Sequence, residues 1–314
     1  MLYIIEFTDN EREPAMTPLP TLRQLQFFMA LVRRASFSKA AEDCLVSQST
    51  LSSAIKEMEA LMDQQLVDRS TRAFALTPAG EEVASRAPAL LAGAEDLVRA
   101  ASGRRPLEGP FTLGVIPTIA PFILPRAAKL LKKAYPELDL YLREDLTATL
   151  AERLSAGLID AAVLAFPYEI HGVDIIEIGD DPFWFACAEN HPFANKKSVS
   201  RTDVNGCELL LLEDGHCLRD HAIDACELRD RDAAAAFGGT SLFTLAQMAR
   251  SGLGATLLPE MAVREGLAKG ADLVTIPFSD PAPARRIGVA WRHGSGRKEE
   301  AMALAATLKE ALAN

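Results

Sequence analysis

Hydrophobic spacing divides the chain into a helical first part and a mixed remainder. Over residues 21–101, apolar residues recur at steps of three and four, the spacing of amphipathic helices. Beyond Pro110, short apolar runs alternate with longer helical stretches, an order typical of α/β domains. The pattern therefore predicts an all-α-rich N-terminal part, a long linker helix and an α/β domain.

Three short helices are predicted at the start of the helical part. The first ends near Arg34, the second spans residues 39–44 with Ser38 as its cap, and the third spans 48–61 with Ser47 as its cap. Two short helices joined by a tight turn are typical of a helix-turn-helix, whose second helix enters the major groove of DNA. The residues expected to face DNA are polar or small: Ser38, Gln48, Ser49, Thr50, Ser52, Ser53 and Lys56.

Residues 66–77 predict two short strands around a basic turn. Arg69 and Arg72 lie at this turn, where they can contact phosphates. A helix-turn-helix followed by such a wing predicts a winged DNA-binding domain over residues 17–76, although the helices alone would also suit an ordinary small helical bundle. Residues 1–16 share no pattern with the rest of the chain and are expected to be a flexible extension, with Met16 as an alternative start.

One long helix is predicted over residues 77–103, opened by Thr77 and Pro78. Its apolar residues form a heptad seam at steps of four and three: Val83, Ala87, Leu90, Ala94, Leu97 and Ala101. A single helix of this length needs an apolar partner, so we expect it to pair with the same helix of a second chain. Packing against its own chain is the alternative.

The remainder, residues 104–314, is predicted to be an α/β regulatory domain. It begins with a hinge rich in Gly, Pro and Arg over residues 102–110. Strands are predicted over residues 111–116, 138–142, 161–165, 183–188, 208–212, 255–258 and 287–291, and helices over 120–135, 146–156, 242–251 and 297–313.

Charge narrows the place where nucleic acid could bind. The whole chain has a net charge of −10, which argues against a protein that coats nucleic acid nonspecifically. Residues 21–105, however, hold 11 Lys and Arg against 10 Asp and Glu, so this segment can approach phosphates without strong repulsion. There is no apolar run long enough to span a bilayer and no signal peptide, so we expect a cytoplasmic protein without a membrane partner.

The strongest candidate for a reactive residue is Cys217, which lies between a predicted apolar strand and a predicted helix. Helix N-termini and nearby cations lower a cysteine pKa, and we expect the first-turn amides, Arg219 and His216 to supply this effect. Cys217 is thus a candidate nucleophile, although a buried apolar cysteine is the commoner use of such a residue. A metal site made of His216, Cys217, His221 and Cys226 is disfavoured because Cys226 lies too far around the helix. No metal and no cofactor are expected.

Two segments resemble known proteins. The run from Ala35-Ser-Phe-Ser-Lys-Ala-Ala to Leu76-Thr-Pro-Ala-Gly is similar to the winged helix-turn-helix of LysR-type transcription regulators, except that Asp63 stands where the family usually has Gly. The run Leu212-Glu-Asp-Gly-His-Cys-Leu-Arg-Asp, with a second cysteine nine residues after the first, resembles the sensing loop of the peroxide-responsive members.

The resemblance implies a fold and a set of site residues. Residues 104–314 would form two periplasmic-binding-protein-like subdomains around a cleft. Cys217 would be the peroxidatic cysteine and Cys226 the resolving cysteine, joined by a disulfide on oxidation. The peroxide pocket would be lined by Thr118, Thr147, His216 and Arg285.

The same resemblance implies partners: double-stranded promoter DNA, hydrogen peroxide, RNA polymerase, a cellular thiol reductant, and copies of the chain in a homodimer or homotetramer. The chain would act as a transcription regulator and not as an enzyme. A LysR-type regulator that binds a small organic effector is the alternative within the fold, and a thiol peroxidase is the alternative outside it.

Overall fold

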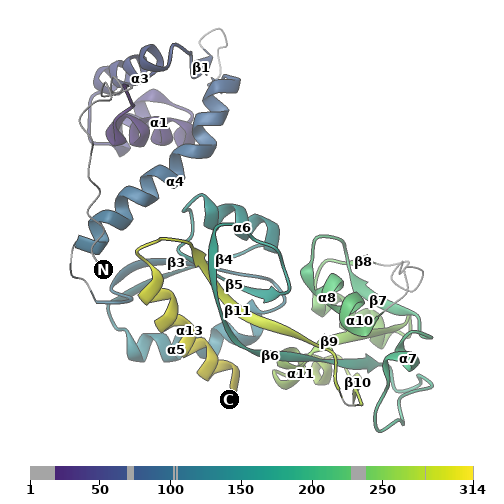
Figure 1. Ribbon diagram of the computed structural model, residues 1–314. Helices are drawn as coiled ribbons and strands as arrows, with labels where there is room; N and C mark the ends of the chain where they lie inside the picture. The colour runs from purple at the N-terminus through teal and green to yellow at the C-terminus, as the bar shows by residue number, and fades with distance from the viewer. Residues whose placement is uncertain are drawn as a thin grey trace, which may run out of the picture. The chain divides into compact units, whose positions relative to one another are not determined.

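The computed structural model describes residues 18–68, 74–101, 103, 105–227, 238–279 and 281–313. The chain divides into two compact units, Met1–Leu91 and Ala92–Asn314 (Figure 1). The long helix α4 (Pro78–Ala101) begins in the first unit and ends in the second.

The first unit contains the predicted helix-turn-helix. Its helices are α1 (Leu22–Arg34), α2 (Phe37–Asp43) and α3 (Gln48–Met62). Ser47 caps α3 as predicted, accepting a hydrogen bond from the Thr50 amide at 3.1 Å. Asp63 adopts the left-handed conformation at the end of α3, with φ of 49°, so the turn that the family usually builds with Gly is retained.

The predicted cap of the second helix is wrong by two residues. Ser36 has the extended backbone of an N-cap and accepts from the Lys39 amide, so α2 begins at Phe37. Ser38 lies in the first turn instead, and its hydroxyl donates to Gln48 Oε1 at 2.8 Å. This bond ties the start of α2 to the start of α3.

The wing strands are β1 (Val67–Asp68) and β2 (Ala75–Leu76), which pair antiparallel. Buried Glu59 of α3 accepts from the amides of Leu66 and Val67 and so fixes the wing to the third helix. Gly80 allows α4 to pass against the wing, because a Cβ there would stand 2.1 Å from the Leu66 carbonyl oxygen. Arg69 and Arg72 lie outside the described residues.

The predicted heptad seam divides in the middle of α4. Val83 and Ala87 pack against the core of the first unit. For these two residues the alternative prediction, packing of the helix against its own chain, is confirmed. Leu90 and Leu97 are 59% and 73% exposed, and Val98 is exposed beside them. Only the later part of the seam is therefore open to a partner.

The second unit is a mixed sheet covered by helices, as expected for an α/β sensor domain. Its strands are β3 (Gly109–Val115), β4 (Leu138–Glu144), β5 (Ala161–Phe166), β6 (Val173–Cys187), β7 (Leu209–Leu212), β8 (Gly238–Gly239), β9 (Ala255–Pro259), β10 (Val274–Pro277) and β11 (Ala284–Arg292). The strand order is β4-β3-β5-β11-β6-β9-β7-β8, with β10 paired to β6.

Helices follow or separate these strands. They are α5 (Ala120–Ala134), α6 (Thr147–Ser155), α7 (Arg201–Val204), α8 (Cys217–Cys226), α10 (Leu242–Arg250), α11 (Glu260–Arg264), α12 (Leu267–Gly270) and α13 (Lys298–Ala313). Helices α5 and α13 pack together, and α6 lies on the other side of the first strands (Figure 1). None of the described helices is both long and apolar enough to cross a membrane.

The long strand β6 runs through both subdomains of this unit. The first part of β6 pairs with β11 in the first subdomain, and its last residues pair with β9 and β10 in the second. The sequence predicted only the end of β6 as strand, because Asp and Glu interrupt the apolar run before Phe183. These acids sit on a strand whose side chains alternate between buried and open positions.

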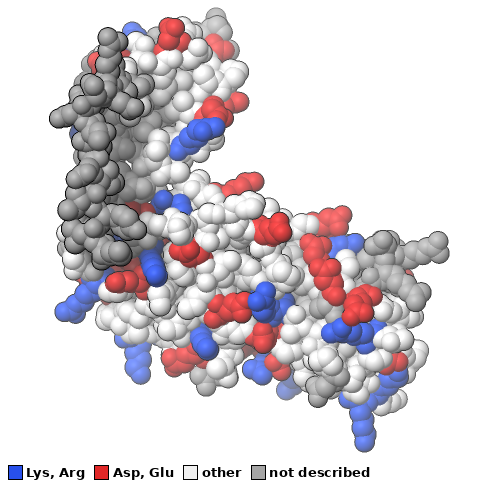
Figure 2. Space-filling model, viewed as in Figure 1, with Lys and Arg blue, Asp and Glu red and all other residues white. Residues whose placement is uncertain are grey.

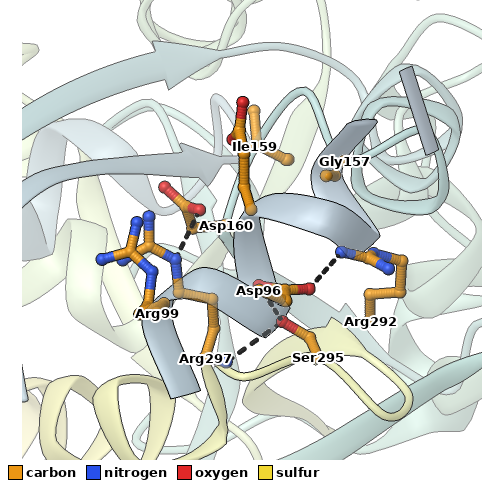
Figure 3. Close-up of a pocket in the computed structure, with 10 residues that line it drawn as sticks. Asp96, Arg99, Gly157, Ile159, Asp160, Arg292, Ser295 and Arg297 are labelled. Carbon is orange, nitrogen blue, oxygen red and sulfur yellow. Dashed lines mark hydrogen bonds and ion pairs between the residues drawn. The ribbon is translucent and has the colours of Figure 1, made fainter. Parts of the chain in front are cut away.

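Charges of both signs are interspersed over the visible face (Figure 2). A separate cluster of charged residues is partly buried where the end of α4 meets the sheet (Figure 3). Asp96 of α4 accepts from Arg292 of β11 at 2.6 Å. Arg297 pairs with Asp160 at 2.8 Å and with Glu300 at 2.6 Å, and it donates to the Pro110 carbonyl oxygen at 3.2 Å.

Replacing Arg297 by Ala should lower the free energy of unfolding of this unit by about 3 kcal/mol, because Asp160 loses this partner and Glu300, whose side chain is 7% exposed, keeps only the more distant Arg99 at 3.7 Å. Urea denaturation measures the change. Arg286→Ala is the matched control: its ion pair with Glu177 is about half exposed on both sides, so the expected loss is below about 1 kcal/mol. Equal losses in the two variants would contradict the stabilising role of the buried group.

Candidate functional site

Helix α8 begins at Cys217 and ends at Cys226, so the two cysteines are its first and last residues. It follows the buried strand β7 through a turn in which Gly215 has φ of 95°, a conformation that favours glycine. His216 is the N-cap residue, and its side chain does not cap the helix. The predicted strand-to-helix position of Cys217 is confirmed.

The expected low pKa of Cys217 is wrong. The residue is only 6% exposed, and burial raises the pKa of its thiol, while the nearby Thr147 hydroxyl and the charge of Arg285 oppose that rise. Arg219 does not provide the nearby charge, because it pairs with Asp214 at 3.0 Å and donates to the Leu212 carbonyl oxygen at 3.3 Å. Burial also lowers the pKa of His216, so this imidazole is neutral at pH 7.

Arg285 is the cation that reaches the site. It lies on β11 and is 1% exposed. Its Nη1 and Nη2 donate to the side chain and the carbonyl oxygen of Thr118 at 2.8 and 3.0 Å, and its Nε donates to Asp181 at 3.0 Å. The charge is thus buried, paired and fixed in direction, which is the condition for a steady electrostatic effect on a neighbouring group.

The two predicted threonines lie at the ends of different strands. Thr118 follows β3, and its hydroxyl and carbonyl oxygens both accept hydrogen bonds from Arg285. Thr147 is the first residue of α6, and its Oγ1 is buried near Cys217 and has no hydrogen-bond partner among the described residues. A buried polar atom without a partner is uncommon, so Thr147 is available to a small polar molecule.

Cys226 does not join the other candidate residues. Nine residues of intact helix put the Cα atoms of Cys217 and Cys226 roughly 13 Å apart along the helix axis. A disulfide requires Cα atoms within about 7 Å. Both thiols are free, and burial raises the pKa of Cys226 to about 12. The structure is therefore that of a reduced protein.

Two further buried polar residues are His221, which the sequence suggested only as a disfavoured metal ligand, and Asp181, which it did not single out. His221 Nε2 is 2.8 Å from the Pro167 carbonyl oxygen, a contact that ties α8 to the end of β5. Asp181 lies within a charged run of the sequence, and its pairing with a residue 104 positions away gives no local signal. Among the described residues, no group of three or more His, Cys, Asp or Glu could hold a metal ion.

The surface expected to contact DNA is formed by one side of α3. Leu51, Ile55 and Met58 are completely buried in the core of the first unit. The opposite side is open: Gln48, Ser49, Thr50, Ser53 and Lys56 are exposed and Ser52 is partly exposed, with exposed Ser38 next to Gln48. This alternation leaves polar side chains free to reach base edges and phosphates.

Comparisons with known proteins cover nearly the whole chain. Residues 22–81 match the model of the bacterial regulatory helix-turn-helix protein, lysR family, and residues 104–313 match the LysR substrate binding domain. A probable hydrogen peroxide-inducible genes activator of Streptomyces viridosporus is 39% identical over 93% of this chain and 95% of its own length. The regulator EstR of Acinetobacter baylyi is 38% identical over 91% of this chain and 95% of its own.

A solved structure supports the same assignment. A full-length OxyR variant of Pseudomonas aeruginosa has a TM-score of 0.78 with this chain at 32% sequence identity, covering 93% of this chain and 98% of that one. The resemblance stated from the helix-turn-helix and from the loop around Cys217 is thereby confirmed. The chain belongs to the LysR family of transcription regulators and, within it, to the OxyR-like members.

Proposed function

We propose that this transcription regulator senses hydrogen peroxide through Cys217 and that Cys226 resolves the product. The Cys217 thiolate attacks one peroxide oxygen, the O–O bond breaks, and the leaving hydroxide takes a proton to become water, so that sulfur is oxidised to sulfenic acid. The Cys226 thiol then attacks that sulfur, a disulfide forms and a second water leaves. Two thiols of a cellular reductant restore the starting state.

The observation that carries the proposal is the surroundings of the Cys217 sulfur. A buried thiol beside the Thr147 hydroxyl and the fixed charge of Arg285 has a donor and a cation ready for a leaving hydroxide. We propose Thr118 and His216 as the remaining lining of the peroxide pocket.

A small organic effector in the cleft remains the alternative function. Effectors that carry a carboxylate would pair with the cleft arginine, but Nε of Arg285 is already bonded to Asp181 and its NH groups to Thr118. The arginine therefore has little bonding capacity left for such a ligand, which favours the peroxide proposal.

Mass spectrometry of the peptide that carries Cys217 tests the proposal. After treatment with a small excess of hydrogen peroxide, we expect sulfenic acid on Cys217 in a Cys226→Ser variant and a 217–226 disulfide in the wild type. The rate should rise with pH, because burial raises the pKa of the thiol and only the thiolate reacts. Unmodified Cys217 after full oxidation of an exposed model thiol would refute it.

We also propose that residues 17–76 bind double-stranded promoter DNA, that 77–103 act as linker and dimerisation helix, and that 104–314 sense the signal.

Arg69→Ala should weaken binding to all sequences and flatten its dependence on salt, since a phosphate contact is lost. Gln48→Ala should instead change base preference, because Gln48 is exposed at the start of α3. Binding measured at several salt concentrations separates the two effects. An unchanged salt slope in Arg69→Ala would contradict the wing contact.

Dimerisation is proposed through the exposed later part of the α4 seam. Leu90→Glu should dissociate the dimer, because a charge in an apolar seam loses its hydration without gaining a partner. Sedimentation measures the change, and Glu82→Gln, on an exposed part of the same helix, is the control. An unchanged oligomeric state of Leu90→Glu would place the dimer contact elsewhere.

The remaining parts of the proposal concern partners and setting. The regulator acts as a homodimer or homotetramer in the cytoplasm, contacts RNA polymerase at the promoter and has no enzymatic turnover of its own. Steady consumption of peroxide with a thiol reductant, at a rate independent of DNA, would instead identify a thiol peroxidase.

A further inference from the structure

Asp181 is a buried acid that none of the proposed chemistry uses. It lies on β6 directly opposite Arg285 of β11, and its side chain is 1% exposed against 0% for the arginine. Asp181 Oδ2 accepts from Arg285 Nε at 3.0 Å, and Oδ1 accepts from the Met261 amide at 3.0 Å. Both oxygens are occupied, so the carboxylate itself is held in place from two elements.

Arg285 is held between this carboxylate and Thr118. The bonds to Thr118 engage Nη1 and Nη2, and the bond to Asp181 engages Nε. The guanidinium cannot rotate toward or away from Cys217 without breaking bonds on both sides. The orientation of the guanidinium is therefore fixed in part by Asp181, a residue of the neighbouring strand that lies 104 positions away in the sequence.

The negative charge of Asp181 also reduces the field that Arg285 exerts on its surroundings. Burial raises the pKa of the Cys217 thiol, and the charge of Arg285 opposes that rise. A carboxylate 3.0 Å from the guanidinium cancels part of this effect at longer range. An arginine without its carboxylate would stabilise the Cys217 thiolate more strongly.

Few other charges compete with this pair around α8. Of the strands packed against α8, β5 and β7 carry only apolar side chains. Strand β11 carries Arg285, the exposed Arg286 paired with Glu177 and, as its last residue, Arg292 paired with Asp96. Thr147 of α6 is uncharged. On α8 and its cap, His216 and His221 are buried with lowered pKa values, and Asp220 disfavours the thiolate.

We infer that Asp181 is a positioning residue that holds Arg285 beside the sensing cysteine and offsets part of its charge, and so restrains the reactivity of Cys217. The inference rests on the proposed role of Cys217 for its biological meaning. This role differs from that of a purely structural salt bridge in one respect. Removal of the acid and removal of the arginine must shift the pKa of the Cys217 thiol in opposite directions.

The test is the titration of the Cys217 thiol in the full-length reduced protein, followed by iodoacetamide alkylation between pH 6 and 11. Mass spectrometry of fragment ions assigns the label to Cys217. In Asp181→Asn we expect the thiol pKa to fall by about one unit, which makes alkylation at pH 7 about tenfold faster. In Arg285→Gln we expect it to rise by about one unit.

Asp180→Asn is the matched control. It removes the same charge from the neighbouring exposed position of β6 and should leave the titration unchanged. Asp181→Glu, which keeps the charge, should return the pKa toward the wild-type value. Shifts in the same direction for Asp181→Asn and Arg285→Gln, or no shift in a folded Asp181→Asn, would overturn the inference.

A double variant keeps the test valid if Asp181→Asn does not fold. Replacing both residues leaves no unpaired buried ion, and it is compared with Arg285→Gln alone. Burial raises the pKa of Asp181 and Arg285 opposes that rise, so the two variants are compared at the alkaline end of the titration, where an ionised Asp181 gives the single variant the higher thiol pKa. Equal pKa values would overturn the inference. Because alkylation does not involve peroxide, the titration would still test the role of Asp181 if the peroxide proposal failed.

Discussion

Cys217→Ser is expected to abolish the response of this regulator to hydrogen peroxide and to leave its fold intact. A serine hydroxyl has nearly the volume of the thiol but does not ionise or react with peroxide at neutral pH. The Thr147 hydroxyl and Arg285 would remain in place, so peroxide could still bind without being reduced. The measurement is promoter binding with and without peroxide, followed by footprinting, and the expected change in the variant is zero.

Cys207→Ser is the control for this result. Cys207 is partly buried in the same subdomain, and its sulfur donates to the Asp203 carbonyl oxygen, away from the site. It should respond to peroxide as the wild type does. A peroxide-dependent footprint that persists in Cys217→Ser would assign the sensing chemistry to another residue.

Leu218→Ala is expected to favour the oxidised form of the protein by about 100-fold. The disulfide cannot form on an intact α8, so oxidation must unwind the helix and remove Leu218, which is 3% exposed, from its packing site. Truncating a buried leucine costs about 3 kcal/mol in the state that packs it and little in the state that does not. The change thus penalises the reduced form alone.

The equilibrium between reduced and disulfide forms in glutathione buffers measures this shift, which corresponds to roughly 60 mV for a two-electron couple. Asp224→Asn is the control, because this residue is exposed on the same helix and loses no packing. An equilibrium that Leu218→Ala leaves at the wild-type value would mean that α8 keeps its packing in the oxidised state.

The helices of the first unit and the position of Cys217 could be predicted from local patterns. Ser47 before a polar helix start, Pro78 in a first turn and four leucines before Gly215 are features that neighbouring residues decide. These local rules failed only in detail, as at Ser36, where two serines two positions apart could each cap the same helix.

The electrostatics of the site could not be predicted in the same way. Arg219 is near Cys217 in sequence, but Asp214 and a backbone carbonyl draw its side chain away. Arg285 and Asp181 reach the site because β11 and β6 pair along their length, a register that no local pattern specifies. Burial of the thiol likewise depends on the whole sheet, which is why its pKa rises where the helix start alone predicted a fall.

The seam of α4 shows the same limit. Its heptad spacing continues without interruption, yet one half meets the core of the first unit and the other half is exposed. Sequence spacing identifies an apolar stripe, but only the tertiary structure shows which part of it is already covered.

We expect helix α8 to exist in two states that are selected by the disulfide between Cys217 and Cys226. The decisive measurement is hydrogen exchange by mass spectrometry on a sample shown to contain the 217–226 disulfide. The amides of residues 217–226 should lose protection on oxidation in the wild type, and Cys217→Ser and Cys226→Ser should retain it under the same treatment. Unchanged protection of these amides in a sample that contains the disulfide would show that α8 does not unwind on oxidation.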